Sequence, residues 1–222
     1  MTTLPVLEPT FPGYAEMMDL ERRPPEPQLP PVVRPSREEA EAAVRTLIAL
    51  TGDNPARSGL LETPARVVRA YSEFFAGYGA DIEAMLARTF DDVEGYDELV
   101  VVGGIDFTSH CEHHIVPFSG TCVIGYLPGD RVVGLSKLGR LVDALAQRLQ
   151  MQERLTKQIA DALHTHLAPR GVGVVVRASH TCMTCRGARK PRAVATTSEM
   201  RGLMRSEASL RAEFLKLARL RT

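Results

Sequence analysis

The stretch LVVVGGIDFTSHCEHHIVPFSGTCVIGYL, residues 99–127, decides how the rest of the chain is arranged. Two runs rich in β-branched and aromatic residues, 99–107 and 118–127, predict two neighbouring β-strands. Between them lies CEHH, in which Cys111 and His114 are three positions apart. At that spacing one thiolate and one imidazole can hold the same metal ion. The stretch therefore predicts a strand–loop–strand unit that carries part of a metal site.

A second cluster, HTCMTCR, occupies residues 180–186. Its Cys182 is a candidate third ligand, and three protein ligands leave a fourth position for water, as in catalytic zinc sites. Zinc lowers the pKa of such a water from about 15.7 towards about 7. Cys185 leaves a second arrangement open, a closed structural site made by Cys111, His114, Cys182 and Cys185 together. Cys122, in the middle of a strand, is expected in the core.

Two histidines beside these ligands are candidates for proton transfer. His113 adjoins the first ligand pair, and His180 lies two positions before Cys182. Residues two apart share a face of a strand, so a strand through Cys182 would point both side chains the same way. An imidazole with a pKa near about 6.5 can accept and donate protons at working pH. His110 is interpreted as a residue that supports the metal ligands from behind or has no effect on function. His164 and His166 are interpreted as surface residues.

The segment GLSKLGR, residues 134–140, predicts an anion-binding helix start. Ser136 is expected as the N-cap, with Lys137 in the first turn and Arg140 one turn further on. Free N–H groups and the helix dipole favour an anion there, whereas cations alone are unfavourable at that end. We therefore expect a phosphate group between these side chains, with a solvated basic face as the alternative.

Two further arginines are candidate anion ligands. Arg186 belongs to a basic segment, residues 182–205, with six lysines and arginines against one acid. Arg66 follows Thr63 and Pro64, which are expected to start a helix as N-cap and first helical residue. A cation in the first turn opposes the dipole unless an anion lies beside it. A solvated arginine is the alternative for each.

Composition narrows the class of protein. The chain has 222 residues and is 44% hydrophobic, which is enough for one sizeable core. Its 27 basic and 27 acidic residues balance, which argues against a general nucleic-acid or membrane-surface binder. Four cysteines without a secretory-type apolar segment favour a reducing compartment, and no apolar run approaches the length of a membrane span. We expect a cytoplasmic protein.

The chain divides into three parts. Residues 1–35 hold nine of the 15 prolines and predict a flexible tail. Residues 36–95 predict a helical region that begins with a capping box, Ser36 to Glu39. Its second helix, from Thr63, is expected to carry a buried stripe: Val67, Tyr71, Phe74, Phe75 and Tyr78. A short helix is expected at 81–88.

Residues 96–222 predict the catalytic region. Strands are expected at 99–107, 118–127, 173–179 and 192–197, and helices at 136–150, 153–167 and 207–220. This order predicts an α+β fold with an antiparallel four-stranded sheet and two covering helices. Such a sheet has two edges to protect from unwanted pairing.

Four motifs in this order, CEHH, GLSKxxR, QxQERLT and HxCMxxRG, resemble those of the GTP cyclohydrolase I family over residues 36–222. The resemblance implies the tunnelling fold, β2α2β2, whose sheets join between subunits into a closed barrel, with two rings in a decamer. It implies zinc held by Cys111, His114 and Cys182, with Cys185 not a ligand. The implied reaction converts GTP and water to 7,8-dihydroneopterin triphosphate and formate, the first step of folate and pterin synthesis.

The resemblance also implies site roles. Glu153 would accept hydrogen bonds from N1–H and the exocyclic amine of guanine, although a helix-start glutamate stabilised by the dipole is the simple alternative. Arg66 would reach the substrate of a neighbouring subunit. The catalytic candidates are His113, His180 and Ser136. The substrate-binding candidates are Glu153, Gln152, Lys137, Arg140, Arg186 and Arg66.

Two other functions compete with this interpretation. A nitrile reductase of the same fold would act on a deazaguanine with a nucleophilic cysteine and a nicotinamide cofactor, and without zinc. The CEHH motif and its matching Cys182 argue against it. A zinc-ribbon module would bind nucleic acid or protein, but the neutral charge and the roughly seventy residues between the ligand pairs argue against that.

Overall fold

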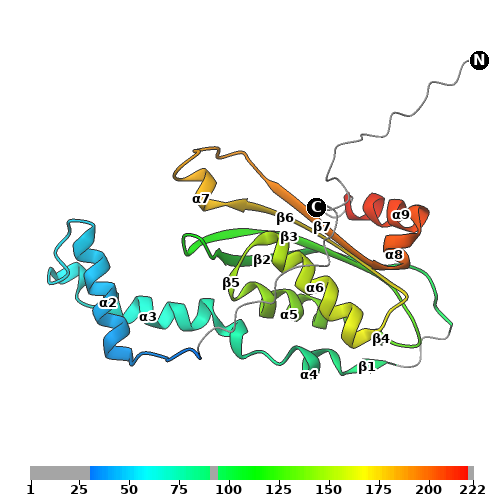
Figure 1. Cartoon of the computed structure of the whole chain (residues 1–222), viewed down its shortest axis with the longest axis horizontal. Coiled ribbons are helices and arrows are strands. Elements are labelled where there is room, and N and C mark those ends of the chain that lie inside the picture. The colour runs from blue at the N-terminus through cyan, green and yellow to red at the C-terminus, as the bar shows by residue number, and fades with distance from the viewer. Residues whose placement is uncertain (1–30, 91–94, 220–222) are drawn as a thin grey trace, which may run out of the picture.

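A curved five-stranded sheet forms the centre of the computed structural model, which describes residues 31–90 and 95–219 (Figure 1). The strand order is β5-β2-β3-β6-β7. The strands are β2 (Val100–Cys111), β3 (Val116–Leu127), β5 (Leu149–Gln150), β6 (Gly171–His180) and β7 (Ala195–Gly202). The predicted α+β class is confirmed. The expected tail, residues 1–35, lies almost entirely outside the described residues.

The four long strands pair antiparallel, as predicted. The two-residue β5 was not expected; it pairs parallel to β2 at His110 and Cys111. Strand β2 is longer than its apolar run suggested, because its last residue, Cys111, still pairs with Val116 of β3. The CEHH motif therefore forms the tip of a long hairpin. Strand β7 begins three residues later than expected.

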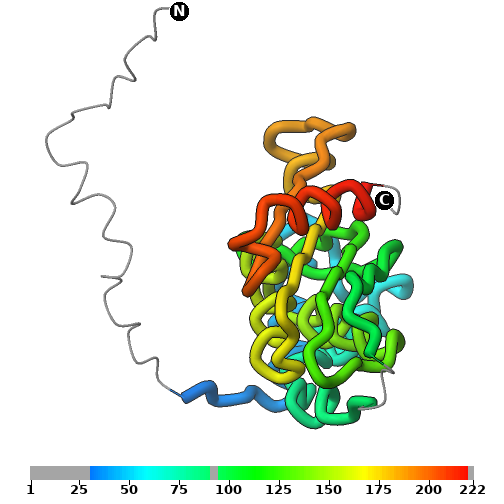
Figure 2. Tube along the Cα trace, turned by 90° about the vertical axis from the view of Figure 1, so that its right-hand side faces the viewer, coloured from blue at the N-terminus to red at the C-terminus, as the bar shows by residue number. Residues whose placement is uncertain are grey.

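Helices α5 (Leu135–Ala146) and α6 (Gln152–Leu167) cover one face of the sheet. Their buried leucines and Ile159 pack on Phe107, Phe118 and Ile124. On the other face lies α9 (Ala208–Arg219), which crosses the strands in Figure 2. Its fully buried Phe214 lies on two glycines, and a Cβ on Gly125 or Gly173 would come within 2.5 or 2.6 Å of the ring.

The N-terminal helices α2 (Arg37–Leu50) and α3 (Thr63–Phe74) lie to one side of the sheet (Figure 1). The capping box of α2 is confirmed: the N–H of Glu39 donates to Ser36 Oγ at 3.2 Å, and the N–H of Ser36 donates to the carboxylate of Glu39 at 2.7 Å. The expected Thr63 cap is wrong. The preceding Glu62 is the N-cap and makes no side-chain bond, so the helix begins one residue earlier.

The expected burial of the aromatic stripe is also wrong for the single chain. Helix α2 has no buried residue, and in α3 only Pro64 is buried. Tyr71, Phe74 and Tyr78 are 43%, 42% and 58% exposed. The helix ends at Phe74, before the last two residues of the expected stripe, Phe75 and Tyr78. Within residues 31–90 and 95–219, helices α2 and α3 pack on each other and leave these aromatic side chains largely exposed.

Short elements attach the N-terminal half to the sheet. The predicted helix at 81–88 is α4 (Ile82–Leu86), and its Leu86 is fully buried in the main core. Strand β1 (Thr89–Phe90) pairs with β4 (Val132–Val133). Among the described residues, no helix is long and apolar enough to cross a membrane.

The expected Ser136 cap is wrong as well. Gly134 is the N-cap of α5, and Ser136 is the second residue inside the helix. The helix ends at Ala146, four residues early, because Gln147 leaves the helical conformation at ψ 51° and the chain then enters β5. After β7 the chain forms α8 (Leu203–Ser206), and then α9 close to its expected range.

Candidate metal centre and active site

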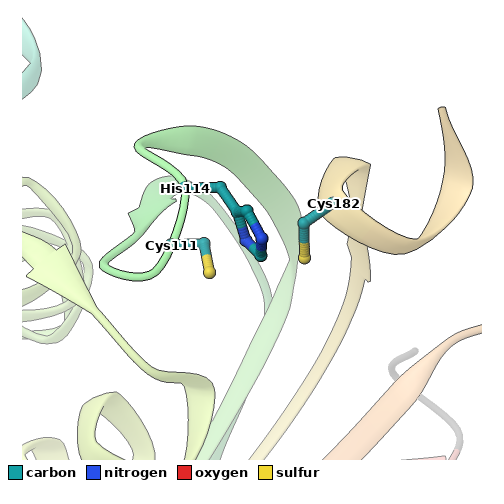
Figure 3. Close-up of side chains that lie close together, drawn as sticks. All are labelled: Cys111, His114 and Cys182. Atoms are coloured by element: carbon teal, nitrogen blue, oxygen red, sulfur yellow. The ribbon is translucent and has the colours of Figure 1, made fainter. Parts of the chain in front are cut away.

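Three side chains from two distant parts of the chain converge at one end of the sheet (Figure 3). The ligand atoms of Cys111, His114 and Cys182 all lie within 4.8 Å of one another. Cys111 is buried, Cys182 is partly buried and His114 is exposed. Two thiol sulfurs and one imidazole form a donor set typical of zinc, and three protein ligands leave a coordination position open.

The hairpin tip holds the first two ligands in a tight turn. The N–H groups of His114 and Ile115 both donate to the carbonyl of Cys111, at 3.3 and 2.8 Å. Ile115 adopts a left-handed conformation with φ 53°, which is strained for a β-branched residue. The N–H of Glu112 donates to the carbonyl of Gln150 at 3.0 Å, so β5 also anchors this turn.

The third candidate ligand comes from a short helix and not from a strand. Strand β6 ends at His180, and Cys182 lies in α7 (Thr181–Thr184). The hydroxyl of Thr181 donates to the carbonyl of Pro117 at 2.5 Å, which ties α7 to the other side of the hairpin. The shared-face argument for His180 and Cys182 therefore fails, although both residues lie near the hairpin tip.

The remaining cysteines are outside this group. Cys185 is exposed, and its thiol donates to the carbonyl of Thr181 at 2.9 Å. The described residues thus place three cysteine and histidine ligands together and not the four of the closed structural site. Cys122 is fully buried, as predicted, and burial strongly raises the pKa of its thiol.

Polar and charged side chains contact the candidate ligands, and the Cys111 thiol affects the ionisation of Cys182. Burial raises the pKa of the Cys182 thiol, and the nearby Cys111 thiol raises it further. Nδ1 of His113 lies 3.6 Å from Cys111 Sγ. Arg186 donates from Nη1 to Nε2 of His114 at 2.9 Å. Of the expected phosphate ligands, Arg186 is the one that contacts a member of the metal group.

The ring of His180 is held from two directions. It stacks on Phe118 with 4.5 Å between ring centroids and 6° between planes. Its Nε2 lies 2.8 Å from Oε1 of Gln152. Burial lowers the pKa of His180, and the charge of Glu153 partly opposes this shift. Glu153 itself is exposed in the first turn of α6.

The three residues of the expected anion site lie in the first half of helix α5, whereas its last residue is the one near the metal group. The last residue of that helix, Ala146, accepts a 2.6 Å hydrogen bond from Ser109, which is close to the metal group. Ser136 is ten residues earlier, about 15 Å along the helix at 1.5 Å per residue. Within one chain, the expected anion set therefore lies away from the candidate metal ligands. This set comprises Ser136, Lys137 and Arg140.

Arg66 is also away from the metal group. Phe74, at the end of α3, contacts His110 with 4.7 Å between ring centroids. Arg66 is exposed and lies eight residues earlier on that helix, about 12 Å along it. Part of the basic segment is neutralised, because Arg201 forms ion pairs with Asp161 and Glu199.

The structure adds one contact that the sequence did not suggest. Arg154 of α6 forms an ion pair with Glu112 of the hairpin tip, and this pair lowers the pKa of Glu112. The two residues are 42 positions apart, and no local pattern links them. His110 is buried against Phe74 and Phe75, and burial lowers its pKa. His164 is exposed and His166 is partly buried.

Comparisons with known proteins agree on one family. The sequence model of GTP cyclohydrolase I matches residues 40–219. The GTP cyclohydrolase 1 of Maricaulis maris (strain MCS10) is 51% identical over 184 residues, covering 83% of this chain and 90% of that protein. That of Hyphomonas neptunium (strain ATCC 15444) is 52% identical over 186 residues, covering 84% of this chain and 90% of the relative.

Among solved structures, the archaeosine synthase QueF-Like in the apo form has a TM-score of 0.41 and 17% identity, covering 48% of this chain and 96% of that chain. The sequence matches extend over most of this chain and include the hairpin tip, α5, α6 and α7. The chain therefore belongs to the GTP cyclohydrolase I family of enzymes.

Proposed function

We propose that this enzyme converts GTP and water to 7,8-dihydroneopterin triphosphate and formate, and that it depends on zinc. The observation that carries the proposal is the convergence of Cys111, His114 and Cys182 within 4.8 Å in a member of this family. Sulfur and imidazole donors fit zinc better than they fit magnesium or calcium, which prefer oxygen. Bound zinc would supply a Lewis acid that activates water near neutral pH.

Residues of the chain are also proposed for proton transfer and for recognition of guanine. His180 is the proposed proton-transfer residue, because its ring is fixed by Phe118 and Gln152 beside the metal group. His113 is the second candidate, 3.6 Å from Cys111 Sγ. Glu153, exposed next to His180, is the proposed reader of the guanine edge, with two charge-assisted hydrogen bonds.

The triphosphate ligands are proposed to come partly from a second copy of the chain. Ser136, Lys137 and Arg140 lie about 9 to 15 Å along α5 from the end that adjoins the metal group, with Arg140 the nearest of the three. A neighbouring subunit can supply the same residues, together with Arg66, to complete the site. The exposed aromatic residues of α3 and the incompletely paired edges of the sheet support a homo-oligomer. The tunnelling-fold barrel and the decamer are the proposed form of this assembly.

Two measurements on purified full-length protein test the proposal. Metal analysis is expected to give about one zinc per chain, and incubation with GTP is expected to give pterin fluorescence and equimolar formate. Stripping zinc with a chelator should abolish product formation, and added zinc should restore it. A protein that instead oxidises a nicotinamide cofactor with a deazaguanine nitrile, or that binds zinc yet leaves GTP unchanged, would contradict the proposed activity.

A further inference from the structure

The side chain of Gln152 is buried, and other residues of the chain occupy its hydrogen-bonding groups. It is 2% exposed, and its amide nitrogen donates to the carbonyls of Val176 and Ala195 at 3.1 and 3.2 Å. The same nitrogen lies 3.1 Å from Oγ1 of Thr197. These bonds connect α6 to both β6 and β7. A buried amide with this many partners is costly to move, because each broken bond leaves a polar group unpaired.

This network fixes which way the amide points. Two of the three neighbours of Nε2 are backbone carbonyls, which only accept hydrogen bonds. Turning the amide over would place Oε1 against both carbonyl oxygens. Oε1 of Gln152 must therefore be the atom that faces His180, at 2.8 Å from its Nε2.

The orientation of the amide in turn decides where His180 carries its proton. An amide oxygen only accepts, so Nε2 of His180 must be the donor of this hydrogen bond. In a neutral imidazole the other nitrogen, Nδ1, then bears a lone pair. Within residues 31–90 and 95–219, no side chain or backbone group is hydrogen-bonded to that Nδ1. Stacking on Phe118 at 4.5 Å and 6° keeps the ring plane from turning.

We propose that Gln152 is a positioning residue, which fixes the orientation of His180 and holds its proton on Nε2, so that Nδ1 is the ring nitrogen offered to the substrate. This replaces the expectation from the sequence that Gln152 contacts the substrate. The inference rests on the proposed function for the role of His180, but the placement of the proton is independent of it.

The assignment has a consequence for both charge states of the ring. A neutral His180 presents an acceptor at Nδ1. In the imidazolium form, Nε2–H still donates to Gln152, and the additional proton is on Nδ1. The hydrogen bond to Gln152 is therefore kept throughout, and any proton exchanged with a bound substrate passes through Nδ1.

The direct test is the tautomer of His180 in the zinc-loaded wild-type protein. Solid-state ¹⁵N NMR of histidine-labelled protein at about pH 8.5, well above the ordinary histidine pKa of about 6.5, separates protonated from bare ring nitrogens. A His180→Gln sample identifies the His180 signals. We expect a protonated Nε2 and a bare Nδ1. A neutral ring with its proton on Nδ1 would overturn the proposal without any reference to activity.

The kinetic test uses Gln152→Met, which keeps the side-chain length and removes the hydrogen bonds. We expect kcat to fall at least about tenfold, since acid–base catalysis depends on placement, with KM for GTP within about twofold. The matched control is Thr197→Val, which removes an acceptor from the same buried network but does not touch His180; its kcat should stay near wild type. A raised KM with unchanged kcat in Gln152→Met would make Gln152 a substrate ligand and refute the positioning role.

The two proposals fail in different ways. Wild-type protein that leaves GTP unchanged refutes the proposed function, whereas its His180 tautomer still decides the position of the proton. If Gln152→Met does not fold, the wild-type tautomer alone decides the inference.

Discussion

Arg154 and Glu112 form a bidentate ion pair between helix α6 and the hairpin tip. Nη1 of Arg154 lies 2.5 Å from one carboxylate oxygen of Glu112, and Nη2 lies 3.0 Å from the other. Glu112 is in the turn that presents Cys111 and His114, and Arg154 follows Glu153. The pair therefore connects the metal ligands to the proposed guanine-reading residue. Paired guanidinium and carboxylate groups in this geometry restrain orientation as well as distance.

Breaking this ion pair should weaken zinc binding. Groups that orient metal-ligand segments typically contribute about ten- to hundredfold to metal affinity. We expect Arg154→Glu to lose zinc to a competing chelator at about tenfold lower chelator concentration than wild type. The double variant Glu112→Arg/Arg154→Glu should recover most of that loss, because the opposite charges are restored.

Lys157→Glu is the control for this experiment, since Lys157 pairs with Asp161 on the same helix and does not contact the hairpin. It should bind zinc as wild type does. If the double variant binds zinc no better than Arg154→Glu does, the ion pair does not stabilise the turn that carries Cys111 and His114.

The three-ligand site predicts different results for Cys182, which lies in α7, and for Cys185, which is the C-cap of that helix. Cys185→Ser should keep zinc and most activity, because Cys185 is exposed and its thiol donates to the carbonyl of Thr181, one turn earlier. Cys182→Ser should lose both. Metal content measured after gel filtration distinguishes the cases. Zinc loss from the Cys185 variant would support the closed four-ligand site.

Substitutions of Lys137 and Arg140 in α5 should weaken binding of the triphosphate and leave binding of the base unchanged. We expect Lys137→Ala and Arg140→Ala each to weaken GTP about tenfold, about 1.4 kcal/mol, with little change for guanosine and unchanged zinc. Arg186→Ala should do the same to GTP, and its contact with His114 makes zinc content a necessary parallel measurement. Equal losses for GTP and guanosine would contradict the phosphate role.

A shared site predicts complementation between damaged subunits. Arg66→Ala chains supply an intact metal group, and Cys182→Ser chains supply an intact Arg66. Mixed and reassembled, they should recover part of the wild-type activity, because some sites then combine two undamaged halves. Subunit exchange is verified with differently tagged chains. Demonstrated exchange with no recovery of activity would place Arg66 outside the neighbour's site.

Glu153→Gln should bind GTP at least about tenfold more weakly, about 1.4 kcal/mol, with zinc unchanged. The substitution keeps the size of the side chain but removes the charge and one acceptor. ATP should bind poorly to both proteins, because adenine has no donor at N1 and no amine at C2, and sites built to pair a polar group reject analogues that lack it. Calorimetry on zinc-loaded samples measures both ligands. Unchanged GTP affinity would show that Glu153 does not bind guanine and only stabilises the start of α6.

The sequence by itself identified the groups whose chemistry is local. Thiol and imidazole spacing indicated Cys111 and His114 as candidate metal ligands, the SREE pattern determined the start of α2, and apolar periodicity located α5, α6 and the four long strands. These features depend on residues a few positions apart, and the motifs that carry them were sufficient to suggest the family.

Tertiary structure alone decided the roles that depend on distant partners. Gln152 was expected to bind the substrate, and only the fold shows that its amide is hydrogen-bonded to β6 and β7 and faces His180, which supports the positioning role proposed above. Ser136 was expected as the N-cap of an anion-binding helix and as a catalytic residue, but it is the second residue inside α5 and lies about 15 Å along the helix from the end that adjoins the metal group. The aromatic stripe that begins in α3 was expected to be core, but within the described part of the chain Tyr71, Phe74 and Tyr78 are exposed. In each case the residue types were informative, while their function depended on contacts set by the packing of elements far apart in the sequence.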